Sequence, residues 1–147
     1  IRIVLKTTNP SASLGEMAPK SLRFFLRGLP QHVYPLFEHV MNHVVDVAVA
    51  TSVKDKKPVL LDKGCIRMVG FEEQDGLLPY SKRSFLGYRL LTEFFAFPSK
   101  FLFFDIDRLP QGKLAESGTG IELYFYLNRS SDALEQFVLT GPCTDAT

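Results

Sequence analysis

Apolar and polar residues alternate along several short stretches of the chain, and this period of two is typical of half-buried β-strands. The clearest stretch runs from Ile121 to Asn128, where every second residue is Ile, Leu or Phe. Ile1 to Lys6 and Leu22 to Arg27 show the same alternation, and Gly28 ends the second of them. Shorter apolar runs predict the remaining strands at Val45 to Thr51, Val59 to Leu61, Cys65 to Phe71 and Phe101 to Phe104.

Helical spacing of three and four residues appears after Gly28. The predicted core face of this helix consists of Val33, Phe37, Val40, Met41 and Val44. Proline is favoured in the first turn of a helix, so either Pro30 opens it or Pro35 does after an irregular turn. A short further helix is predicted from about Ser131 to Phe137.

A second long helix lies in a segment rich in aromatic residues. Nine of the eighteen aromatic residues of the chain fall between Tyr80 and Phe104. Ser84 is the predicted N-cap of the helix, and Pro98 ends it because proline has no backbone N–H. Gly87 costs a helix about 1 kcal/mol relative to alanine, which predicts that another backbone approaches closely at this position.

The polar side of this second helix is narrow and consists of Arg89, Thr92 and Glu93. Such a helix lies deep inside a domain or at a contact with another protein. The helical spacing of Phe94 and Phe95 from the preceding leucines predicts that both belong to the core. Phe95→Ala is therefore expected to destabilise the fold by about 3–5 kcal/mol.

Strands outnumber helices by about seven to three, and the two do not alternate regularly. This pattern predicts an α+β fold with a mainly antiparallel sheet of about seven strands, or two packed sheets, and with two main helices and one short helix. At 147 residues the chain fits a single globular domain, residues 1–147. It begins without methionine, and we expect it to be a fragment of a longer protein.

The composition argues against several functional classes. A formal net charge of +1 provides no global field that would attract nucleic acid or an anionic membrane. No apolar run approaches the roughly 18 residues that span a bilayer, and we expect no signal peptide. The lysines around Asp55 are predicted to form a solvated hairpin tip. Two cysteines are too few for a disulfide framework, and Cys65 is predicted to be a core residue in a reducing compartment.

The histidines and the glycine-rich segment provide no clear metal or cofactor motif. His39 and His43 share a helix face, but the zinc pattern HExxH is absent and no Cys or carboxylate is placed to complete a tetrahedral site. We expect these two and His32 to be surface or interface residues. Glu116 to Gly120 (ESGTG) precedes a strand instead of a helix, so it is predicted to be a turn and not a phosphate-binding loop.

Asp105 and Asp107 carry the one enzymatic alternative. Their spacing resembles the nucleophile and acid pair of haloacid-dehalogenase-like phosphatases, in which one carboxylate attacks phosphorus and the other protonates the leaving group. The usual Thr or Val of that family is Leu109 here, and neither a downstream acidic pair for Mg²⁺ nor a second βα unit follows. We therefore expect the two aspartates to end a strand. No catalytic triad is indicated by the sequence either.

Two stretches carry a resemblance to a known family: LRFFLRG at Leu22, and VGFEE with LLPYSKRSFLGYRLLTEFFAFPSKFLFFD between Val69 and Asp105. They resemble the TssF (VasA/ImpG) family of baseplate subunits of the bacterial type VI secretion system. Weaker similarity extends over nearly the whole chain and matches the middle portion of proteins several times longer. Pro35 departs from the family pattern, as does Ser99, where an acidic residue is expected.

This resemblance implies a structural protein and not an enzyme. Family members resemble wedge proteins of contractile phage baseplates. The resemblance implies assembly with TssG, a second TssF copy, TssE and TssK in a cytoplasmic wedge that docks at the inner-membrane complex. Such wedges surround the VgrG spike and carry the platform of the contractile sheath. No cofactor, small-molecule substrate, nucleic acid or direct membrane insertion is implied.

The predicted protein-interface residues of the aromatic segment are Tyr80, Lys82, Arg83 and Arg89. A cation directly ahead of a helix costs about 0.3–1 kcal/mol, so local stability does not require Lys82 and Arg83. Arginine beside aromatic residues is typical of contact surfaces, where it stacks or binds a carboxylate. The alternative is that Arg83 pairs within the chain with Glu72 or Glu73 and anchors the predicted acidic turn that begins at Glu72 (EEQDGLLPY).

Overall fold

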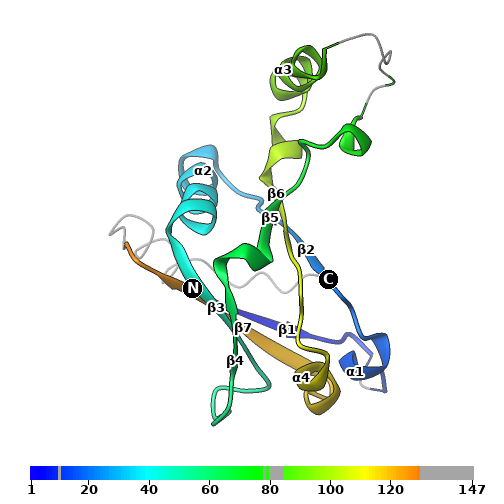
Figure 1. The fold of residues 1–147 in the computed structure, drawn as a ribbon, viewed down its shortest axis with the longest axis vertical. Coiled ribbons are helices and arrows are strands. Elements are labelled where there is room, and N and C mark those ends of the chain that lie inside the picture. Colours follow the sequence, from blue (N-terminus) through cyan, green and yellow to red (C-terminus); the bar gives the residue numbers. More distant parts are fainter. Residues whose placement is uncertain (10, 78, 80–84, 130–147) are drawn as a thin grey trace.

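The computed structural model describes residues 1–9, 11–77, 79 and 85–129, and its strands form two antiparallel sheets (Figure 1). The first sheet has the order β1-β7-β3-β4, with β1 at Arg2–Lys6, β7 at Gly120–Leu127, β3 at Val44–Ala50 and β4 at Val59–Asp62. The second has the order β2-β6-β5, with β2 at Leu22–Phe25, β6 at Phe103–Ile106 and β5 at Ile66–Met68. This arrangement confirms the predicted α+β class with two packed sheets.

The first long helix, α2 (Pro30–Glu38), begins at the earlier of the two candidate prolines and contains Pro35 in its interior. It continues as the π-helical turn η1 (His39–His43). The remaining helical elements are α1 (Leu14–Met17), η2 (Lys63–Cys65), η3 (Glu73–Asp75), α3 (Leu86–Ala96), η4 (Pro98–Leu102) and α4 (Gln111–Glu116). The predicted helix from Ser131 to Phe137 lies outside the described residues. Within the described part of the chain, no helix has the length and apolar character needed to cross a membrane.

The hydrophobic core lies between the two sheets and is closed on one side by the end of α2 and η1. The Phe104 ring of β6 stacks on Phe24 of β2, with ring centroids 5.3 Å apart. Cys65, predicted to be a core residue, is 1% exposed. The other core residues from the strands include Val47, Val49, Ile106, Ile121, Leu123 and Phe125. Each sheet therefore buries one face in a shared core.

The predicted hairpin between β3 and β4 is present, and its tip is anchored to another part of the fold. The Asp55 carboxylate accepts hydrogen bonds from the backbone N–H groups of Thr51 and Lys57, at 3.0 and 2.9 Å. Lys113 of α4 donates to the same carboxylate at 3.0 Å. Together these hydrogen bonds hold the pKa of Asp55 well below its usual value, and those from the two backbone N–H groups are the largest cause. Asp55 thus joins the hairpin to α4, while the lysines beside it in sequence are exposed.

Three predicted strands are shorter than expected, and the one predicted from Leu22 to Arg27 already ends at Phe25. Phe101 and Leu102 belong to η4, which Pro98 starts, so β6 begins only at Phe103. At the other end, Cys65 closes η2, and β5 ends at Met68 although the Val69 N–H still donates to the Phe103 carbonyl at 3.2 Å. Gly70 has a φ of +106°, a conformation that favours glycine, and it turns the chain away from the sheet.

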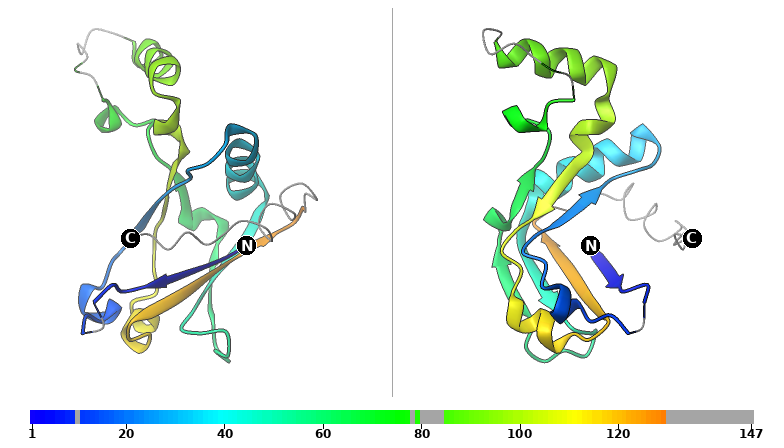
Figure 2. Two further views of the ribbon diagram at one scale, coloured as in Figure 1. Left: turned by 180° about the vertical axis from the view of Figure 1, so that it is seen from behind. Right: turned by 90° about the vertical axis from the view of Figure 1, so that its right-hand side faces the viewer.

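Residues 70–77 and 85–102, here called the arm, project from one end of the second sheet (Figures 1 and 2). The arm contains η3, α3 and η4, and α3 ends before Pro98 as predicted. Its N-cap is Phe85, so the prediction of Ser84 was wrong by one position. Among the residues that the structure describes, the closest neighbour of Gly87 is the Phe85 ring and not another backbone as predicted.

Candidate protein-interaction site

Helix α3 of the arm has its polar side buried and much of its apolar side exposed. Arg89 is 4% exposed and Glu93 is 0% exposed. By contrast, Phe94 is 49% exposed and Phe95 is 76% exposed, so the prediction that both belong to the core was wrong. Tyr88 and three further apolar residues of the segment, Phe85, Leu91 and Phe97, are also more than half exposed.

The buried side of α3 faces the acidic turn, and Arg89 holds that turn in place. Its Nη1 donates to the Glu73 carbonyl at 2.7 Å, and its Nη2 donates to the Glu72 carbonyl at 2.8 Å. Gly76 packs directly against the guanidinium, since a Cβ there would lie 2.8 Å from Nη1. The guanidinium therefore fixes the turn through main-chain groups, and the Glu72 and Glu73 side chains are not needed for the contact.

Glu93 is the anion at the centre of this buried polar cluster. Its Oε1 accepts a hydrogen bond from the Leu77 N–H at 2.9 Å and lies 3.9 Å from Arg89 Nε. Its Oε2 contacts the Nζ of Lys100, whose side chain is 8% exposed. Buried charges are tolerated only when they are paired and hydrogen-bonded. The paired charges explain why α3 is oriented with its polar side inward.

The acidic turn has its own internal bonds, which adapt it to α3. The Asp75 carboxylate accepts hydrogen bonds from the Gly70 N–H at 2.8 Å and from the Glu72 N–H at 3.3 Å. A Cβ on Gly70 would lie 3.2 Å from the Lys100 carbonyl oxygen, so the two ends of the arm meet at this glycine. The turn, η4 and α3 thus form one small unit around Arg89 and Glu93.

The predicted interface residues have different outcomes in this geometry. Tyr80, Lys82 and Arg83 lie outside the described residues. Arg89 lies inside the arm and is bonded to the acidic turn. It therefore fills the anchoring role that was considered for Arg83. The exposure of the apolar side of α3 was not predicted from the sequence. The i, i+4 spacing of Arg89 and Glu93 was nevertheless a signal that a buried ion pair could form there.

The exposure of Phe95 changes the expected effect of Phe95→Ala. Because the ring is 76% exposed, we expect the variant to change the free energy of unfolding by less than about 0.5 kcal/mol. The matched control is Phe104→Ala, since Phe104 is 1% exposed and its removal is expected to cost about 3–5 kcal/mol. Urea unfolding of both variants checks this, and similar losses in the two would show that Phe95 is covered.

Asp105 is the second-last residue of β6 and Asp107 follows the strand directly. Asp105 lies between two arginines on neighbouring strands. Arg23 of β2 and Arg67 of β5 stand opposite Asp105 in the strand register. Arg23 donates Nε to Oδ1 at 2.8 Å and Nη2 to Oδ2 at 2.9 Å, and Arg67 donates Nη2 to Oδ2 at 3.1 Å. The Arg23 hydrogen bonds are the main cause that lowers the pKa of Asp105. Since both oxygens are engaged, Asp105 is a cross-strand anchor and not an available nucleophile.

The histidines of η1 serve the fold. His39 is 9% exposed, so the prediction of a surface or interface position was wrong for this residue. Its Nδ1 donates to the Pro35 carbonyl at 2.8 Å, one turn earlier. His43 Nδ1 lies 3.2 Å from Asn128 Oδ1 of the chain segment after β7. In the part of the chain that the structure describes, no three His, Cys, Asp or Glu side chains are grouped so as to hold a metal ion.

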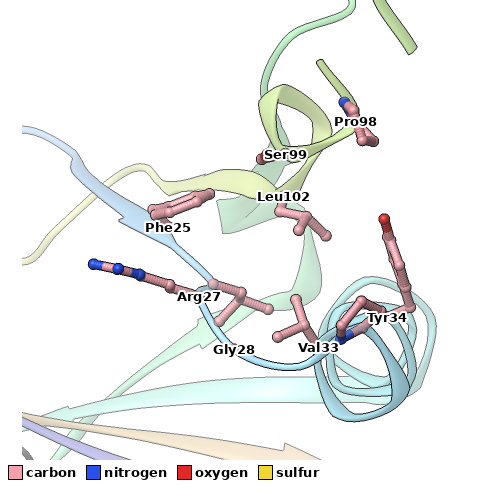
Figure 3. Close-up of a pocket in the computed structure, with 10 residues that line it drawn as sticks. Phe25, Arg27, Gly28, Val33, Tyr34, Pro98, Ser99 and Leu102 are labelled. Atoms are coloured by element: carbon pink, nitrogen blue, oxygen red, sulfur yellow. The ribbon is translucent and has the colours of Figure 1, made fainter. Parts of the chain in front are cut away.

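A hollow of about 350 Å³ separates α2 from the base of the arm (Figure 3). Val33 and Tyr34 of α2 face Pro98 and Leu102 across it, while the Arg27 side chain extends away alongside Phe25. Its lining residues are Phe25, Leu26, Arg27, Gly28, Pro30, Val33, Tyr34, Pro98, Ser99 and Leu102. None of the ten is a carboxylate, histidine or cysteine, so the hydroxyls of Ser99 and Tyr34 have no general base beside them among these lining residues.

Comparison with solved structures shows a similar fold in a chain of a type VI secretion system TssK-TssF-TssG baseplate subcomplex determined by cryo-electron microscopy. The TM-score is 0.65 at 23% sequence identity, over 77% of this chain and 21% of that chain. Among curated proteins, the chain is 33% identical over 131 residues to the type VI secretion system component TssF1 of Pseudomonas aeruginosa.

The match to TssF1 includes 86% of this chain, which spans about a fifth (21%) of the length of that relative. The family model described as "Type VI secretion system, TssF" matches residues 1–141. The match therefore covers both sheets and the arm with its buried Arg89–Glu93 cluster. On these grounds the chain belongs to the TssF family of type VI secretion system proteins.

Proposed function

We propose that this chain is a structural part of a type VI secretion baseplate and that it acts by holding subunits together. The observation that supports this most directly is the exposed apolar side of α3, in a chain of the TssF family. Contiguous exposed apolar surface on a protein marks a contact with another protein more often than it marks a free surface. The buried ionic groups of the arm, Arg89, Glu93 and Lys100, are used internally, which suits a rigid arm that presents this surface.

TssG and TssK are the proposed direct partners, because the similar solved chain comes from a complex with both. We further propose a second TssF copy, TssE and the VgrG spike as neighbours in the same wedge. The wedge would lie in the cytoplasm and dock at the inner-membrane complex. Neither nucleic acid, a small-molecule substrate nor direct membrane insertion forms part of the proposal.

The proposed role is mechanical and not catalytic. The only sequence pattern that favoured an enzyme was the pair Asp105 and Asp107. Asp105 is engaged by two arginines, and Arg67 Nε also lies 3.4 Å from Asp107 Oδ2. The hollow beside α2 provides no catalytic grouping either. A phosphatase function is thus not favoured by any observation on this chain.

Removal of the arm from the full-length protein tests the proposal. Gly70 and Lys100 are adjacent, so an Asn-Gly hairpin turn can replace residues 71–99 and join the two ends without straining the sheets. We expect this variant to keep its circular dichroism spectrum apart from the lost helix, but to lose co-purification with TssG and TssK and to lose secretion.

The unmodified full-length protein is the reference in the same experiment. If it does not co-purify with TssG or TssK, the baseplate function itself is wrong. If the armless protein assembles and secretes as the unmodified protein does, the arm is not the contact. The two failures are therefore distinguishable.

A further inference from the structure

Two histidine rings lie side by side on η1, the π-helical turn that joins α2 to β3 (Figure 1). His39 and His43 are four residues apart in the chain. Their ring centroids are 5.1 Å apart, and the angle between the ring planes is 56°. Short π-helical turns next to α-helices are frequent at functional sites. The pair therefore stands out as a candidate ligand site in the sheet-bearing part of the molecule, away from the arm.

The hydrogen bonds of the two rings fix the same tautomer in both. His39 Nδ1 lies 2.8 Å from the Pro35 carbonyl oxygen, and His43 Nδ1 lies 3.2 Å from Asn128 Oδ1. Because both oxygens can only accept a hydrogen bond, each Nδ1 carries the proton and each Nε2 keeps its lone pair. Histidines that bind metal ions are held in this way, with one ring nitrogen donating to an oxygen and the other coordinating the ion.

The Nε2 atom of His39 is a buried acceptor without a partner. His39 is 9% exposed, and its Nε2 makes no hydrogen bond to any of the described residues. Such an atom has lost its hydration without a replacement, and in native proteins it requires an explanation. Imidazole nitrogen is a good ligand for ions such as Zn²⁺, Cu²⁺ and Ni²⁺. An ion of this kind on Nε2 would use the lone pair that the fold leaves unpaired.

The separation of the two rings suits a single ion. With metal–nitrogen distances of about 2.0–2.1 Å, two imidazoles on one tetrahedral ion have ring centroids about 5 Å apart. The observed 5.1 Å agrees with this arrangement. In the part of the chain that the structure describes, no third His, Cys, Asp or Glu joins the two rings in a ligand group. Water must therefore fill the remaining coordination positions, which predicts a modest affinity.

We propose that His39 and His43 bind one divalent transition-metal ion, Zn²⁺ or a similar ion, through their Nε2 atoms. His43 is half-buried, so the ion enters from the side of this ring and keeps its water ligands there. The bound ion clamps η1, which His43 also joins to Asn128 after β7. Since the two rings meet only in the folded chain, the ion stabilises the fold. The site uses no residue of the arm and is independent of the proposed baseplate contact.

Calorimetric titration of the full-length protein with Zn²⁺ tests the site. His43→Gln removes one of the two ligands, and we expect this variant to bind one Zn²⁺ ion fewer than the unmodified protein. The matched control is His32→Gln on α2, because His32 lies on the helix before η1 and outside the pair. The control should bind as many ions as the unmodified protein. Equal numbers of bound ions in His43→Gln and in the unmodified protein would overturn the proposal.

A second measurement needs no substitution and therefore holds even if His43→Gln fails to fold. Cu²⁺ binds imidazole more tightly than Zn²⁺ does, so it serves as the probe. With ascorbate and oxygen, bound Cu²⁺ oxidises the side chains that ligate it, and peptide mass spectrometry of the full-length protein locates them. We expect oxidation of His39 and His43 that excess Zn²⁺ suppresses. Oxidation confined to other histidines would show that this pair holds no metal ion.

Discussion

Glu93→Gln is expected to lower the free energy of unfolding by about 3–5 kcal/mol, because it leaves two buried cations without their anion. Arg89 and Lys100 have side chains that are 4% and 8% exposed, and Glu93 is the carboxylate that both approach. Glutamine has nearly the same shape and can still accept the Leu77 N–H, so the loss would report the charge and not the packing. Urea unfolding, with hydrogen exchange of the arm amides, measures the effect.

The matched control for this prediction is Glu116→Gln in α4. Glu116 also pairs with a lysine, at 3.3 Å from Lys113 Nζ, but its side chain is 66% exposed. Such surface pairs contribute about 0–1 kcal/mol, so this variant should unfold almost as the unmodified protein does. Equal losses in the two variants would mean that burial of the Glu93 cluster has no energetic consequence and that α3 is oriented by something else.

Asp105→Asn is expected to destabilise the protein by about 1.5–3 kcal/mol, because it weakens the hydrogen bonds that join all three strands of the second sheet. Arg23 and Arg67 reach Asp105 from the two neighbouring strands, and the carboxylate is 4% exposed. The matched control is Asp107→Asn, where the side chain is 36% exposed and pairs, within the described residues, with Arg67 at 3.4 Å. This control should cost no more than about 1 kcal/mol.

The same variant has a defined pH signature. The pKa of Asp105 in the folded protein lies below its ordinary value of 3.8. The stability that the charged carboxylate contributes is therefore fully present above that ordinary value, and it is lost as the pH falls through the lower folded pKa. We therefore expect the gap in stability between the unmodified protein and Asp105→Asn to be full near neutral pH and to narrow below about pH 4. A gap that stays constant in acid would show that the Arg23 pairing does not stabilise the fold. Phosphatase activity in the unmodified protein, lost in Asp105→Asn, would contradict the anchoring role.

Much of the scaffold was predictable because it follows from local periodicity. The alternation from Ile121 to Asn128 corresponds to β7, and that from Leu22 corresponds to β2, since a strand buries every second side chain whatever its partner is. α3 ends before Pro98 because the proline ring leaves no backbone N–H to continue the helix. The family could also be recognised from the sequence, because the aromatic segment that carries the resemblance is contiguous in the chain.

The sequence by itself therefore determined the class of fold, most strand positions, the C-terminal end of the aromatic helix and the family. Only the tertiary structure decided which side of α3 is buried. An amphipathic pattern shows that a helix has two sides, but the buried side depends on what lies against it. Here main-chain carbonyls of the acidic turn, from positions 16 and 17 residues earlier, and Lys100, seven residues after Glu93, satisfy Arg89 and Glu93. Because those groups meet only in the folded chain, the charged side of α3 lies inside the arm and its aromatic side faces outward.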